Sequence, residues 1–137
     1  MSDQANTLEV IPQCGALCLV KGQLVLVTNK KGTRWVIPKG HLELRDSSEA
    51  VRAELEAWEE AGIKGELCEE PLGTYYYRKK GNLYRVVVFR IEDCRLEEDW
   101  PESSARQRVV VPVEQARQMV NEPELREIMG RLPEAGS

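Results

Sequence analysis

Residues 38–63 have the sequence PKGHLELRDSSEAVRAELEAWEEAGI. The pattern predicts a short loop marked by Gly40, then a helix of about four turns, then a glycine stop. Asp46 or Ser47 is expected to cap the start of the helix, and Glu49 follows at the spacing of a capping box. Gly62 stands where a left-handed residue commonly ends a helix.

The apolar residues of this helix suggest which face packs. At about 100° per residue, Val51, Leu55 and Trp58 fall within one narrow arc. Three alanines flank that arc: Ala50, Ala57 and Ala61. We therefore expect this side of the helix to lie against the core.

A second arc gathers carboxylates. Glu56, Glu59 and Glu60 stand at i, i+3 and i+4, where like charges repel one another and mildly destabilise a helix. A divalent cation would stabilise the cluster, because Mg²⁺ binds carboxylate oxygens together with the phosphate oxygens of a substrate. The alternative is a solvated acidic face, which is what most charge runs are.

The order of residues resembles the Nudix box: Gly, five residues, Glu, seven residues, then Arg-Glu-apolar-x-Glu-Glu-x-Gly-apolar. Gly40 and residues 56–63 match it, and the lead-in over residues 35–40 is similar to that of many members. Asp46 replaces the first Glu, Leu55 replaces the Arg, and one extra residue separates those two positions. We place the extra residue near the junction of loop and helix.

The resemblance implies a metal site. Glu56, Glu59 and Glu60 are expected to bind Mg²⁺ or Mn²⁺ together with the backbone carbonyl of Gly40, and Glu59 or Glu60 is the expected general base. In the family the box Arg pairs with a box carboxylate. Arg52 lies one turn before Glu56 on the carboxylate side, and we predict that it supplies this counter-charge.

Further charged residues are candidates for the same site. Arg34 and Lys39 adjoin the box and are predicted to bind substrate phosphates. Other basic residues are either phosphate ligands or solubilising surface: Lys30, Lys31, Arg78, Lys79 and Lys80. A fourth carboxylate is expected from a later loop or from the box loop: Glu97, Glu98, Glu102 or Glu43. We interpret His41, the only histidine, as a loop residue and not as the base.

The substrate is less closely defined. The lead-in, Ala57 with Trp58, and Arg106-x-Arg108 resemble the branch with diadenosine- and diphosphoinositol-polyphosphate hydrolases. That branch often has an aromatic residue after its Arg pair, whereas this chain has three valines at 109–111. Four aromatic residues could stack on a base or pack in the core: Tyr75, Tyr76, Tyr77 and Trp100.

Composition sets the class of protein. With 137 residues, 42% apolar and 31% charged, we expect one domain over residues 1–137, with a flexible tail at 1–6. A net charge of −4 argues against broad nucleic-acid binding. No long apolar run or signal-peptide pattern indicates a membrane partner or export, which favours a cytoplasmic protein. The four cysteines are expected to be free thiols: Cys14, Cys18, Cys68 and Cys94.

The rest of the chain predicts a sheet between helices. We expect two hairpins, over residues 13–29 and 74–92, and Gly15 indicates a bulge or a close backbone approach. Further strands are expected at 34–37, 63–70 and 109–111, and helices at 112–120 and 123–132. This order predicts an α/β fold, and the resemblance implies an α/β/α sandwich with a mixed sheet.

Two classes of function follow. The first is metal-dependent hydrolysis of a phosphoanhydride in a nucleoside diphosphate linked to another moiety, for example a dinucleoside polyphosphate. The second is a catalytically weakened module of the same fold that binds a nucleotide or a protein partner, as the altered box suggests. An acidic helix that serves only as an interaction surface leaves Gly40 and Gly62 unexplained. The sequence is compatible with a monomer or a homodimer.

Overall fold

The computed structural model describes residues 9–133, and the predicted tail at 1–6 lies outside the described residues. The elements follow one another along the chain as β1 (Val10–Val20), β2 (Gln23–Thr28), β3 (Trp35–Val36), β4 (Lys39–His41), α1 (Glu49–Ala61), β5 (Ile63–Lys79), β6 (Asn82–Leu96), β7 (Arg108–Val111), α2 (Val113–Met119) and α3 (Pro123–Met129). The predicted helices and both predicted hairpins are thus present, with bounds that differ by a few residues.

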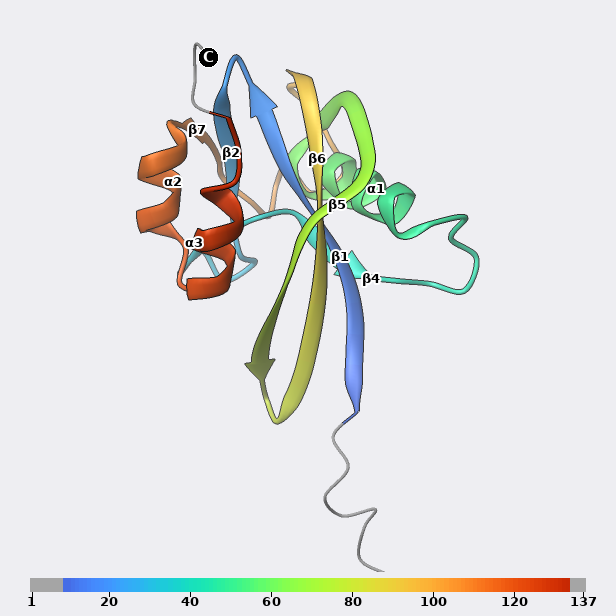
Figure 1. The fold of residues 1–137 in the computed structure, drawn as a ribbon. Helices are drawn as coiled ribbons and strands as arrows, with labels where there is room; N and C mark the ends of the chain where they lie inside the picture. Colours follow the sequence, from blue (N-terminus) through green and yellow to red (C-terminus); the bar gives the residue numbers. More distant parts are fainter. Residues whose placement is uncertain (1–8, 134–137) are drawn as a thin grey trace, which may run out of the picture.

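The strands form a mixed sheet in the order β3-β2-β1-β6-β5, with β4 paired to β1 and β7 paired to β2. β1 runs parallel to β6, and the other pairs are antiparallel. Helix α1 lies on one side of the sheet, and α2 and α3 lie on the other (Figure 1). The predicted α/β/α sandwich is confirmed.

Strand β1 changes partner along its length. Its first half pairs with β4, where Gly15 faces Lys39, and its last residues pair with β2. A Cβ on Gly15 would lie 3.0 Å from Ile37 Cδ1 and 3.2 Å from the Pro38 carbonyl oxygen. The glycine therefore marks a close approach, one of its two predicted meanings, and it lets the box loop lie against the sheet.

Both hairpins turn on a Lys-Gly pair. Lys21 and Gly22 have φ of 50° and 79°, and Lys80 and Gly81 have φ of 51° and 82°. Two successive left-handed residues match the right-handed twist of the flanking strands. The prediction of two separate strands at 63–70 and 74–78 was wrong, because β5 runs through both and absorbs the irregularity as a register shift between Cys68 and Gly73.

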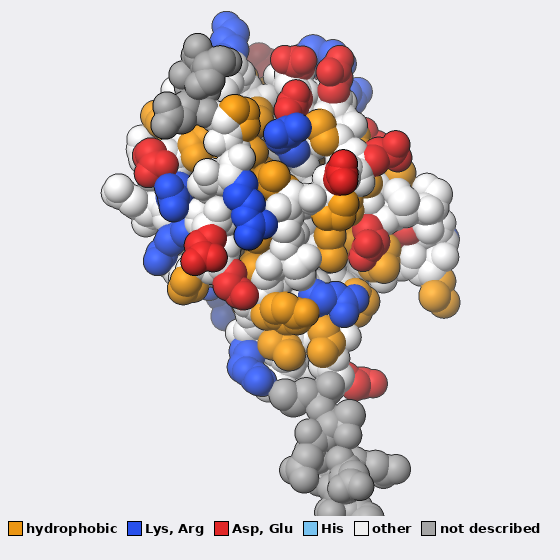
Figure 2. All heavy atoms as spheres, viewed as in Figure 1, with side chains coloured by type: hydrophobic (Ala, Val, Ile, Leu, Met, Phe, Trp, Pro, Cys, Tyr) orange, Lys and Arg blue, Asp and Glu red, His pale blue; other side chains and the backbone are white. Residues whose placement is uncertain are grey.

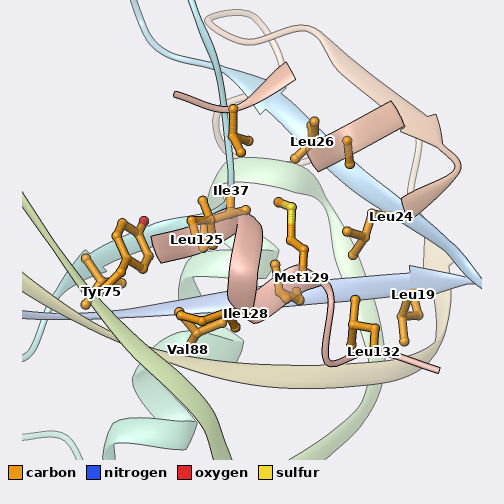
Figure 3. Close-up of a cluster of buried hydrophobic side chains, with 14 of the residues drawn as sticks. Leu19, Leu24, Leu26, Ile37, Tyr75, Val88, Leu125, Ile128, Met129 and Leu132 are labelled. Atoms are coloured by element: carbon orange, nitrogen blue, oxygen red, sulfur yellow. The ribbon is translucent and has the colours of Figure 1, made fainter. Parts of the chain in front are cut away.

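A hydrophobic core lies between the sheet and α3. Leu125, Ile128 and Met129 project from α3 toward buried side chains of the strands (Figure 3). Those strand residues include Leu19, Leu24, Leu26, Tyr75 and Val88. A second core on the opposite face packs α1 against β1 and β2.

The packing face predicted for α1 was wrong at its centre, although the predicted flanking residues Ala50, Ala57 and Ala61 are buried. Val51 and Leu55 are 37% and 36% exposed, and Trp58 is half-buried with Lys64 Nζ 4.9 Å from its ring centroid. Four alanines form the buried face instead: Ala50, Ala53, Ala57 and Ala61. Small side chains let the helix approach the sheet closely, whereas the larger Val51 and Leu55 remain partly exposed.

The ends of α1 are set by Ser48 and Gly62. Ser48 Oγ accepts a hydrogen bond from the Val51 N–H at 3.1 Å, so the expected caps Asp46 and Ser47 were wrong by one or two residues. The Asp46 carboxylate is bound by Arg52 instead. Gly62 has φ of 67° and ends the helix in the predicted left-handed conformation.

All four cysteines are free, as predicted. No helix within residues 9–133 has the length and apolar character needed to cross a membrane.

Candidate functional site

A cleft of about 750 Å³ opens beside β4, where α1 and the β5–β6 hairpin meet the loop after β2. Seven basic side chains line it: Lys30, Lys31, Arg34, Lys39, Arg78, Lys79 and Arg106. Its carboxylates are Glu56, Glu60 and Glu122. The fold thus joins the basic loop before the box to the tip of the second hairpin, although Lys80 lies outside the cleft lining.

This concentration of cations differs from the surface seen in Figure 2. On that face Lys and Arg side chains are interspersed with Asp and Glu side chains. The cleft therefore forms a local positive site in a chain of net negative charge, as expected for a site that binds a polyanion.

Gly40 and Glu56 are in direct contact. A Cβ on Gly40 would overlap the Glu56 carboxylate group. Glycine therefore lets the carboxylate lie against the backbone of the box loop, and a larger residue would displace it.

Arg52 is buried and contacts three carboxylates. Its Nη1 lies 2.9 Å from Glu56 Oε2, and its Nε and Nη2 each lie 2.8 Å from an Asp46 carboxylate oxygen. Glu43 Oε2 is 3.3 Å from Nη2. These contacts hold the pKa of Asp46 below its usual value, whereas burial raises the pKa of Glu56 against the opposing effect of Arg52. Arg52 occupies the place expected of a counter-charge, and its role stays a prediction.

Glu60 is the most strongly perturbed carboxylate of the cleft. Its Oε1 accepts a hydrogen bond from the Lys39 N–H at 3.2 Å, and its Oε2 lies 3.2 Å from Arg106 Nη2. Burial raises the pKa of Glu60 to about 7, although Arg106 acts in the opposite direction. A carboxylate with a pKa near neutrality can accept a proton at physiological pH.

Sequence reasoning missed the place of Arg106 in this site. Besides Glu60, its guanidinium binds Glu102 Oε1 at 2.8 Å and the Thr28 carbonyl oxygen at 2.9 Å. The Arg-x-Arg pair was its only signal. Its contact with Glu60 depends on the pairing of β7 with β2, which no local pattern specifies.

The other predicted carboxylates are placed less centrally. Glu59 is half-buried and does not line the cleft, although its carbonyl oxygen accepts a hydrogen bond from the Glu102 N–H at 3.0 Å. Glu97 and Glu98 do not line the cleft. Across residues 9–133, no three His, Cys, Asp or Glu side chains are arranged as a metal site.

The two predicted phosphate ligands both line the cleft. Arg34 Nη1 lies 3.8 Å from Glu122 Oε2, a distance that leaves the guanidinium only loosely paired. Burial lowers the pKa of Lys39, and nearby Glu60 and Glu122 oppose that change. His41 is exposed at the end of β4, so its assignment to a loop was wrong.

The aromatic candidates for base stacking are mostly engaged elsewhere. Tyr75 is buried in the core, and Tyr76 does not line the cleft. Trp100 packs under Arg108, whose guanidinium carbon lies 4.1 Å from the ring centroid, and its Nε1 donates to the Glu60 carbonyl oxygen at 2.9 Å. Tyr77 alone among the four reaches the cleft.

Residues 11–132 match the NUDIX domain family model. Nudix hydrolase 4 of Arabidopsis thaliana is 36% identical over 109 residues, covering 78% of this chain and 52% of the relative. Diphosphoinositol polyphosphate phosphohydrolase 3-alpha of Mus musculus is 30% identical over 80 residues, covering 58% and 47%. The chain spans about half the length of these curated relatives.

Solved structures share the fold. A NUDIX hydrolase from Nitrosomonas europaea superposes with a TM-score of 0.70 at 19% identity, covering 89% of this chain and 87% of that one. A C. elegans Ap4A hydrolase in a binary complex gives 0.67 at 18% identity, with 88% and 93% covered. At these identities the likeness shows the arrangement of helices and strands alone.

Proposed function

This chain belongs to the NUDIX domain family, and we propose that it hydrolyses a phosphoanhydride bond in a nucleoside diphosphate linked to another moiety. One observation carries the proposal: two buried carboxylates, Glu56 and Glu60, stand in the wall of a cleft otherwise rich in cations. Dinucleoside polyphosphates are the first class to test, because their long phosphate chains would engage several of these cations.

The chemistry requires what this cleft supplies. Attack by water on a diphosphate is slowed by the negative charge of the phosphate oxygens. Cations such as Arg34 and Lys39 would neutralise the charge of those oxygens and hold the phosphate chain of the substrate in place. A nearby carboxylate must then accept the proton of the attacking water.

The donor set fits a divalent cation, Mg²⁺ or Mn²⁺. Mg²⁺ is commonly held by one or two carboxylates, with water and substrate phosphates completing its shell. Glu56, Glu60 and the Gly40 carbonyl would hold it here, because Gly40 lets the Glu56 carboxylate lie against the loop. When bound, such an ion would neutralise phosphate charge and lower the pKa of bound water.

We assign the general base to Glu60 ahead of Glu59. Glu60 lines the cleft and Glu59 does not, so the Glu60 carboxylate is the one placed to accept a proton from water beside a bound substrate. The contacts from Arg106 and the Lys39 N–H would fix the orientation of its carboxylate.

A second candidate is a module that binds the same ligands without turnover. The observation in its favour is that Glu56 and Glu60 are already paired, with Arg52 and Arg106. Metal binding would compete with these ion pairs, so catalysis requires that the metal and substrate outweigh them.

Hydrolysis of a substrate panel, followed by chromatography of the nucleotides that are formed, separates the two candidates. The panel would hold dinucleoside polyphosphates, ADP-ribose, nucleotide sugars and nucleoside triphosphates, each with Mg²⁺, Mn²⁺ or EDTA. We expect metal-dependent turnover by the wild type and losses of about 10²- to 10⁴-fold in Glu60→Gln. Glu54→Gln is the matched control, since it makes the same change on the exposed side of α1.

Three results would decide against hydrolysis as proposed. Turnover that survives EDTA would show that the reaction needs no divalent cation. Equal activity of Glu60→Gln and Glu54→Gln would show that Glu60 is not the general base. Ligand binding without turnover of any member of the panel would favour the binding module.

A further inference from the structure

Gln13 is a buried polar residue that the proposed hydrolysis leaves without a role. It lies on β1 opposite His41 of β4 and Val86 of β6, and it is only 6% exposed. What remains exposed lines the cleft. A buried amide needs a hydrogen-bond partner for each end, because an unpaired one destabilises the fold.

Only one end of the Gln13 amide has a partner. Tyr77 Oη donates a hydrogen bond to Gln13 Oε1 at 2.7 Å, which fixes the orientation of the carboxamide. No side-chain hydrogen bond from the NH₂ group is found within residues 9–133, and the group is not fully enclosed, so it faces the cleft. Since the side chain lines the cleft, this free donor is available to a ligand there.

Tyr77 is itself firmly held. Its ring stacks on Tyr84 with centroids 4.8 Å apart and an interplanar angle of 9°. Lys39 Nζ lies 5.2 Å from the Tyr77 ring centroid. The ring therefore serves as a rigid support for Gln13, and it is already engaged by a phenol and a cation.

The polar character of this wall limits what it can recognise. Binding of a nucleobase usually uses a free aromatic face, and Tyr77 is the only Phe, Tyr or Trp ring in the cleft lining of the described chain. The Gln13 NH₂ group and the Lys39 ammonium group instead offer donors to oxygen atoms.

We propose that Gln13, positioned by Tyr77, is a specificity-determining residue of the cleft. Its NH₂ group donates to a phosphate or hydroxyl oxygen of the moiety attached to the diphosphate. The wall thus selects the phosphorylated or hydroxylated part of a substrate, such as a sugar or polyol phosphate, over its aromatic base. The assignment of this cleft to substrate rests on the proposed function.

Binding of two probes to Gln13 variants tests the contact. Dissociation constants for inorganic tripolyphosphate and ADP-ribose would be measured by titration calorimetry with EDTA present, so that binding is separated from turnover. Gln13→Leu should weaken one or both by about 3- to 10-fold through the lost hydrogen bond. A loss with tripolyphosphate assigns a phosphate oxygen, and a loss with ADP-ribose alone assigns a hydroxyl oxygen.

Three further variants separate the lost contact from simple damage to the fold. Gln13→Glu keeps an acceptor for Tyr77 but replaces the donor by a negative charge, so tripolyphosphate binding should weaken at least about 10-fold. Gln118→Glu is the control, because it adds the same charge at an exposed position on α2. It should change the dissociation constant for tripolyphosphate by less than about twofold. Tyr77→Phe, which releases the carboxamide, should reproduce part of the Gln13→Leu loss.

A folded Gln13→Leu protein that binds both probes as the wild type does would overturn the proposal. So would wild-type binding of ATP more than about fivefold tighter than tripolyphosphate, since stacking of a base gives a gain of that size or more. Failure of hydrolysis is a separate outcome. If no substrate turns over, the dissociation constants still decide the role of Gln13. If one does, Gln13→Leu should raise KM and leave kcat nearly unchanged.

Discussion

The Arg52 guanidinium and the Asp46 carboxylate face each other in a two-point ion pair, with Nε–Oδ2 and Nη2–Oδ1 distances of 2.8 Å each. The remaining nitrogen, Nη1, reaches Glu56 one helical turn further on. Two of the three departures from the box pattern meet here, because Asp46 stands for the expected Glu and Arg52 lies where it can stand in for the Arg absent at position 55.

We expect Arg52→Ala to lower both the stability of the protein and its affinity for Mg²⁺. The change leaves the Asp46 and Glu56 carboxylates without their shared cation, and loss of such an orienting partner typically costs 10- to 100-fold in affinity or activity. Thermal unfolding and metal titration would measure the two effects. Arg45→Ala is the control, since its side chain is 77% exposed and pairs only with Glu43. Unchanged metal binding in Arg52→Ala would refute the hypothesis that Arg52 supplies the counter-charge of the site.

Gly40→Ala should impair activity more than stability. The added Cβ would overlap the Glu56 carboxylate, which is the mobile end of a side chain and can move away at modest cost. The displaced carboxylate would no longer be held as a metal ligand, and we expect kcat/KM to fall roughly 10-fold or more. Wild-type kcat/KM in a folded Gly40→Ala protein would show that the position of Glu56 is not critical.

The stability of the metal-free protein should depend on pH through Glu60. Because burial raises its pKa to about 7, the folded state retains the proton over a range in which the unfolded chain, at about 4.5, has lost it. The contribution of Glu60 is therefore fully present below about pH 4.5 and is lost as pH rises through about 7. The difference amounts to something on the order of 3 kcal/mol.

Chemical unfolding in EDTA from pH 4.5 to 8 would measure this dependence. The wild type should lose stability relative to Glu60→Gln as pH rises across that window. A difference between the two proteins that stays constant over the whole range would contradict the raised pKa.

Neighbouring lysines at the hairpin tip should behave differently. Lys79 lines the cleft and Lys80 does not, although both are exposed. Lys79→Ala should weaken tripolyphosphate binding about 2- to 5-fold, with a smaller effect at high salt, as expected for an exposed charge. Lys80→Ala should have little effect. Equal losses of tripolyphosphate affinity in the two variants would indicate that the ligand responds to the general positive potential of the hairpin tip and not to a defined cleft.

The corrected packing of α1 predicts a further contrast. Ala53 is fully buried against the sheet, so Ala53→Leu should destabilise the protein by about 1–3 kcal/mol through overpacking. Leu55 is 36% exposed, so Leu55→Ala should cost less than about 1 kcal/mol. Denaturant unfolding would compare them. A larger loss of stability in Leu55→Ala than in Ala53→Leu would support the packing face expected from the helical wheel.

Sequence patterns succeeded where local chemistry decides the structure. The Lys-Gly pairs at 21–22 and 80–81 set two hairpins, since turns of this kind need left-handed residues. Gly62 ended α1 for the same reason. The wheel misplaced the centre of the packing face of α1, because it ranks positions by hydrophobicity, whereas close packing on the sheet favoured Ala53 over Leu55.

The sequence by itself determined the box, its carboxylates and the order of helices and strands, because these depend on residues close together in the chain. Only the tertiary structure decided which charges from distant parts of the chain meet. Arg106 reaches Glu60 through the pairing of β7 with β2, and Tyr77 reaches Gln13 across β6. Such contacts depend on strand order and register, which are set by the packing of the whole sheet and not by local periodicity.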